Sequence, residues 1–112
     1  MVTDQLKLLA NAMQAYAWRA KAVASNIANL DTPDYRRMSV TFEETLQEAR
    51  HTIDGASARS EINPRMKVED APPVLEDEMM ELADTQMRTQ LASRALREHF
   101  DLMRTGITGN TG

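Results

Sequence analysis

The sequence predicts an all-α protein in which long N- and C-terminal helices pack as an antiparallel, coiled-coil-like pair. Two apolar stripes with helical spacing, one near each end of the chain, predict these helices. Composition agrees, because only 4% of the 112 residues are aromatic while eight are methionine. Few side chains are large enough to fill a sizeable core, so narrow helix–helix seams fit better. We expect one domain over residues 1–112, with a short middle helix and a long loop between the two helices.

The first helix is predicted over residues 4–30. Its apolar residues recur in alternating steps of three and four, the a/d pattern of a helix that packs lengthwise against another helix. The stripe comprises Leu6, Leu9, Met13, Tyr16, Ala20, Val23, Ile27 and Leu30. Thr3 and Asp4 can cap its start. The stripe fits the buried face of a simple hairpin as well as a face that also packs on other subunits.

A turn is predicted over residues 31–40. Asn29 and Asp31 can bond to nearby backbone groups and so end the first helix. Pro33 cannot continue the helix, and it restricts Thr32 before it to extended conformations. The sequence therefore predicts an abrupt stop and a change of chain direction.

The middle of the chain is predicted to hold a short helix over 41–54 and a loop over 55–73. Thr41 and Glu44 form a capping box, and Phe42 and Leu46 line one side of the helix. The loop is rich in glycine, serine and proline and is unusually long for a compact domain. Within it, residues 66–68 are compatible with a brief strand.

The last helix is predicted over residues 74–105. Acidic residues crowd its start and arginines lie toward its end, and both biases favour the helix dipole. Gly106 is a plausible C-cap. The apolar stripe comprises Met79, Met80, Ala83, Met87, Leu91, Ala95, Leu96, Phe100, Met103 and Ile107.

Several classes of function find no support in the sequence. A net charge of −4 argues against nucleic acid as a partner. There is no cysteine, and His51 and His99 are too far apart for a helical metal motif, so neither a metal nor another cofactor is expected. No base–nucleophile set can be assembled, so we do not expect an enzyme. No apolar run reaches the ~20 residues of a membrane span, and no cleavable signal peptide is apparent.

The end of the first helix carries a recognisable motif. Ala24-Ser25-Asn26-Ile27-Ala28-Asn29, two residues, Thr32-Pro33, one residue and Tyr35 resemble the N-terminal signature of bacterial flagellar rod and hook proteins. The usual pattern has glycine where this chain has Asp34. Residues 74–90, with an acidic Leu-Glu-x-Glu-Met start, are similar to the C-terminal helix of the proximal rod members of that family.

This resemblance implies a structural subunit of the flagellar basal-body rod, which assembles helically through its terminal helices. It implies other copies of the chain, other rod proteins, the adaptor between MS ring and rod, and the export apparatus as partners. It also implies a periplasmic location in the basal body, reached through the flagellar type III system. The alternative is a small helical adaptor or export chaperone that binds one partner helix in a methionine-rich groove.

Two sets of residues are therefore candidates for function. The motif turn comprises Asn26, Asn29, Asp31, Thr32, Pro33 and Tyr35. The predicted assembly interface comprises Leu6, Leu9, Met13, Ala20, Val23, Ile27, Leu30, Met79, Leu82, Met87, Leu91, Phe100 and Met103. Because two narrow seams bury little surface, we expect neighbouring subunits to contribute to stability.

Overall fold

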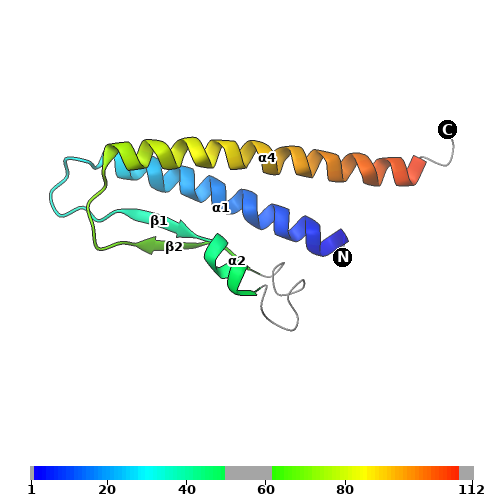
Figure 1. Ribbon diagram of the computed structural model, residues 1–112, viewed down its shortest axis with the longest axis horizontal. Helices are drawn as coiled ribbons and strands as arrows, with labels where there is room; N and C mark the ends of the chain where they lie inside the picture. The colour runs from blue at the N-terminus through cyan, green and yellow to red at the C-terminus, as the bar shows by residue number, and fades with distance from the viewer. Residues whose placement is uncertain (1, 50–61, 109–112) are drawn as a thin grey trace.

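The structure is a computed structural model that describes residues 2–49 and 62–108. Its elements are α1 (Val2–Ala28), β1 (Met38–Thr41), α2 (Glu43–Ala49), β2 (Arg65–Val68) and α4 (Leu75–Thr108). In Figure 1, α1 and α4 lie side by side and run in opposite directions, and the strands lie on the far side of α1. The predicted all-α class with paired terminal helices is confirmed, with a two-stranded sheet added to it.

Helix α1 is the central element, because it packs against α4 on one side and against β1 on another. The side toward the strands carries Ala15 and Ala22, which are 0% and 2% exposed. Small side chains at these positions let the strand and the helix approach closely. The molecule is flat, with extents of 63 × 33 × 14 Å.

The apolar core is small and lies between α1, β1 and the residues next to α2. Phe42 is its largest buried side chain, at 1% exposure, and Val40 and Ile62 pack beside it. Leu46 is partly buried against the same cluster, and its N–H donates to the Phe42 carbonyl at 2.9 Å. Phe42 and Leu46, both expected on one side of the short helix, thus contact the same core, although Phe42 lies just before α2.

The two strands form an antiparallel pair, with Met38 opposite Val68 and Thr41 opposite Arg65. Strand β2 confirms the brief strand expected at 66–68, and all its residues are exposed. Strand β1 was not predicted, and it lies partly within the predicted turn. Each strand pairs with residues 24 or more positions away, and a local sequence pattern does not reveal such pairing.

The start of α2 also differs from the prediction. Thr41 belongs to β1, and its hydroxyl donates to the Arg65 carbonyl at 3.4 Å instead of capping the helix. The helix begins at Glu43, two residues beyond the predicted start. Residues 50–61, which include the predicted end of this helix and the first part of the loop, lie outside the described residues, as do 109–112.

Helix α4 turns polar and small residues toward α1. Glu78, Thr85 and Ala92 are its buried positions, at 0%, 1% and 8% exposure, and they recur every seven residues. The predicted methionine and leucine stripe does not form this seam. Met79, Met87, Leu91 and Phe100 are all more than half exposed, and Met103 is 41% exposed.

Candidate functional site

Asn26, on the last turn of α1, is the centre of a buried polar cluster. Its Nδ2 donates to the Met38 carbonyl and to Glu78 Oε1, both at 2.8 Å. Its Oδ1 accepts from the Met38 N–H at 2.9 Å and from the Tyr35 hydroxyl at 3.2 Å. Asn26 is 0% exposed, so these four bonds satisfy a side chain with no access to water. One amide thus joins α1 to β1 and to α4.

Arg37, just before β1, extends this cluster. Its Nε donates to Glu78 Oε2 at 2.6 Å, and its other nitrogens pair with Glu69 and Glu81. Burial would lower the pKa of Arg37, but the hydrogen bonds to Glu78 and Glu69 outweigh burial and raise that pKa above its ordinary value. Arg37 therefore stays charged and offsets the buried carboxylate of Glu78.

A second arginine links α1 to the start of α2. Arg19 makes two hydrogen bonds to the Glu43 carboxylate, at 2.6 and 2.8 Å, and one to the Val40 carbonyl at 2.9 Å. The hydrogen bond from Arg19 lowers the pKa of Glu43. Arg88 on α4 approaches the same carboxylate at 3.6 Å. Charged groups thus tie both long helices to the strand and helix layer.

The motif turn itself is closed by short local bonds. Asn29 Nδ2 donates to the Ser25 carbonyl at 2.8 Å, and the Thr32 hydroxyl donates to Asn29 Oδ1 at 3.0 Å. The Ser25 hydroxyl contacts the Tyr35 hydroxyl at 2.8 Å. Asp34 has φ = 62°, which is the left-handed region that glycine adopts at little cost. This conformation explains why the resembling motif has glycine here.

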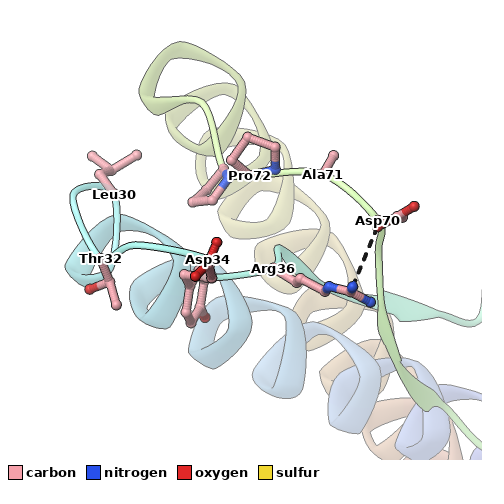
Figure 2. A pocket seen from close by; sticks show the side chains of 9 residues that line it. Leu30, Thr32, Asp34, Arg36, Asp70, Ala71 and Pro72 are labelled. Atoms are coloured by element: carbon pink, nitrogen blue, oxygen red, sulfur yellow. Dashed lines mark ion pairs between the residues drawn. The ribbon is translucent and has the colours of Figure 1, made fainter.

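A surface hollow of about 490 Å³ lies between this turn and the segment that leads into α4. Figure 2 shows its lining side chains, with Arg36 paired to Asp70 at 3.8 Å. The Arg37 N–H donates to the Ala71 carbonyl, and the Glu69 N–H to the Arg37 carbonyl, both at 2.8 Å. The walls of the hollow are therefore held together by backbone bonds.

The structure divides the predicted turn residues into an inner and an outer group. Asn26 is buried and Tyr35 and Asn29 are half-buried, so they hold the fold together. Asp31, Thr32 and Pro33 are exposed. Sequence reasoning did not single out Arg37 or Glu78 as partners of this motif. Glu78 lies at the start of a predicted helix, where an acidic residue is expected because it interacts favourably with the helix dipole. Its bond to Asn26 was therefore not predicted.

The predicted interface residues of the first helix differ in burial, and one of them, Leu30, lies just beyond the end of α1. Val23 is 1% exposed, and the others are partly exposed, namely Leu6, Leu9, Met13, Ala20, Ile27 and Leu30. On α4, Leu82 is partly exposed and the remaining members lie largely in solvent. Several predicted interface residues therefore have surface left for contacts beyond the chain.

Over residues 2–49 and 62–108, no three histidine, cysteine or acidic side chains are grouped as a metal site would require. Among the helices in the described part of the chain, none is long and apolar enough to cross a membrane.

Comparison with known proteins gives a match to a family and a match to a relative. Residues 6–36, which hold most of α1 and the motif turn, match the family described as flagella basal body rod protein. The flagellar basal body rod protein FlgB of Aeromonas hydrophila is 40% identical over 40 residues. That match covers 36% of this chain and 30% of the relative, so it spans less than a third of the relative's length. Together the matches confirm that this chain resembles the flagellar basal body rod family, FlgB included.

Proposed function

We propose that the chain is a structural subunit of the flagellar rod, and that it packs through α1 and α4 against other copies and other rod proteins. The observation that carries this proposal is the exposed apolar surface of α4. This helix packs against α1, which lies within the part of the chain that matches the rod family. Met80 is 72% exposed, and Met87 and Leu91 are each 55% exposed. Apolar side chains that gather on one helix face are typical of a surface that another protein covers.

The polar cluster has a defined part in this role. Asn26, Arg37 and Glu78 fix the closed end of the helix pair, because their bonds are buried and charge-assisted. The helices then present their outer faces at a constant angle, which a repeating assembly needs at every subunit. In this role the chain acts through binding alone, without catalysis or a cofactor.

The finer parts of the proposal follow the family resemblance. We place the chain in the proximal rod, as a single domain, with the MS-ring/rod adaptor and the export apparatus as further partners. The site of action is then the periplasmic part of the basal body, reached through the flagellar type III system. Because that route takes unfolded chains, substitutions on the outer helix faces should leave export intact.

The test separates export from assembly in a strain that lacks the native protein. Met87→Asp places a charge on the exposed face of α4, where it leaves the fold of the subunit unchanged. We expect this variant to be secreted at normal levels, measured by immunoblot, and to build no rods, measured by electron microscopy of basal bodies. Gln14→Asp, at an exposed position of α1 outside the predicted stripe, is the matched control and should build rods. Normal rods with Met87→Asp would overturn the proposal.

The second candidate is a small helical adaptor or export chaperone. The exposed methionines favour it, because flexible thioether side chains adapt to many partner helices. A discrete one-to-one complex with a secreted client, in place of assembly with rod proteins, would establish this alternative.

A further inference from the structure

The outer face of α4 carries a regular stripe that nothing in the described chain covers. Glu76, Met80, Ala83, Met87, Gln90 and Arg94 recur in alternating steps of four and three, and all are exposed. Met80, Met87 and Arg94 each follow one of the buried positions Glu78, Thr85 and Ala92 by two residues. Two residues correspond to about 200° around a helix, so Met80, Met87 and Arg94 point away from α1. Gln90 lies at the edge of the stripe, where it also lines a hollow with Met13 and Ala20 of α1.

We propose that the outer stripe of α4 binds the outer stripe of a second copy of the chain, in antiparallel orientation, to form a closed dimer. Figure 1 shows α4 at the edge of the molecule, with α1 and the strands on its other side. A second α4 can therefore approach without meeting another element among the described residues. The proposal does not rest on the rod function, because a chain that builds no rod can still form this dimer.

Charge selects a second copy in antiparallel orientation. Glu76 begins the outer stripe and Arg94 ends it, and neither has an ion-pair partner among the described residues. Parallel pairing in register would place Glu76 against Glu76 and Arg94 against Arg94, which is unfavourable. Antiparallel pairing places each Glu76 opposite the Arg94 of the other copy, and it also opposes the two helix dipoles.

Side-chain size is compatible with the same register. When Glu76 lies opposite Arg94 of the other copy, Met87 lies opposite Ala83, and Met80 lies opposite Gln90 and beside Leu91. A long methionine then packs over a small alanine at two equivalent places, as knobs fit into holes in a coiled coil. Charge thus selects this alignment of the two helices, and side-chain size is compatible with it.

The resulting contact is isologous, because the same stripe serves both copies about a twofold axis. Such a contact closes at two chains and does not propagate. The dimer also covers the apolar side chains that the proposed rod contacts use, so a subunit has to leave the dimer before it joins a rod.

The first test measures association of the purified chain by sedimentation equilibrium. We expect a reversible monomer–dimer equilibrium in the native chain. Arg94→Glu removes two symmetric ion pairs and opposes like charges, which should weaken the dimer about tenfold. Glu76→Arg should do the same, and the double variant Glu76→Arg/Arg94→Glu should restore dimerisation. Lys21→Glu, an equal charge change at an exposed position of α1, should have no effect. A native chain that stays monomeric, or charge variants that dimerise normally without rescue, would overturn the proposal.

The second test determines the orientation of the two helices. The chain has no cysteine, so each introduced thiol is the only one in its chain. A mixture of Ala83→Cys and Met87→Cys chains should form a disulfide dimer on mild oxidation, because these positions face each other across the axis. Each variant alone should remain uncrosslinked, since its own thiols lie a full helical turn apart. Efficient crosslinking of each variant with itself would indicate parallel packing and overturn the antiparallel dimer.

Discussion

Asn26 and Glu78 lie 52 residues apart in the sequence and share a hydrogen bond of 2.8 Å where both side chains are 0% exposed. The bond joins the end of α1 to the first turn of α4. Met38 and Arg37 complete the cluster from the strand side. A buried polar group without a partner is costly, so each member depends on the others.

Removal of the Asn26 side chain should therefore be strongly destabilising. Asn26→Ala leaves the Met38 backbone groups and one Glu78 oxygen without their partner, at a cost of about 3 kcal/mol or more. The free energy of unfolding in urea, followed by circular dichroism, measures this loss. Asn29→Ala is the matched control, because Asn29 makes only local bonds within the turn, and it should cost about 1 kcal/mol. Equal losses in the two variants would contradict the central position of Asn26.

The lowered pKa of Glu43 predicts acid sensitivity. Its folded-state pKa lies below the ordinary value of 4.5, mainly because Arg19 donates a hydrogen bond to it. Glu43 therefore stabilises the fold above pH 4.5, and this contribution is lost as the pH falls through the folded-state pKa. Glu43→Gln should flatten the acid limb of a plot of unfolding free energy against pH. Glu44→Gln, at the exposed neighbouring position, should leave that limb unchanged.

Asp34 offers a site where a substitution should stabilise the chain. Its positive φ costs about 1 kcal/mol relative to glycine. Part of the gain from a substitution by glycine is offset, because glycine loses more conformational entropy on folding. We expect Asp34→Gly to raise the melting temperature slightly, and Asp34→Val to lower it clearly. Asp31→Gly is the control, because Asp34 is the only non-glycine residue with positive φ in the described ranges. A stabilising Asp31→Gly would show that the effect has another origin.

Phe42 should carry most of the stability of the small core. Phe42→Ala removes its largest apolar side chain and should cost about 3–5 kcal/mol. Thermal melting, followed by circular dichroism, measures this cost. Phe100 is 51% exposed on α4, so Phe100→Ala should change stability by less than about 0.5 kcal/mol.

The long helices could be predicted from sequence because their signals are periodic. The steps of three and four on α1 extend from Leu6 to Leu30, and that periodicity depends only on neighbours along the chain. The β1–β2 pair could not be predicted as a pair. Its partners Val40 and Met66 lie opposite each other in the ladder, across a connection whose geometry no local pattern encodes.

The site was predictable in part. Asn26, Asn29 and Tyr35 stand out because they belong to one contiguous motif. Arg37 and Glu78 do not, because arginine and glutamate are ordinary surface residues and only the fold buries them against Asn26. The stripe on α4 was visible in the sequence, but its direction was not, because periodicity defines a face without saying which partner that face meets.

The bond between Asn26 and Glu78 also sets an order of events during synthesis. Helix α1 leaves the ribosome first, and Glu78 follows 52 residues later. At a translation rate of ~5–20 residues per second, Glu78 is synthesised about 3–10 s after Asn26. Asn26 can bond to Tyr35 and Met38 earlier in this interval, but its bond to α4 cannot form until Glu78 has been made. The two long helices therefore close late, in one non-local step, after most of the chain has been translated.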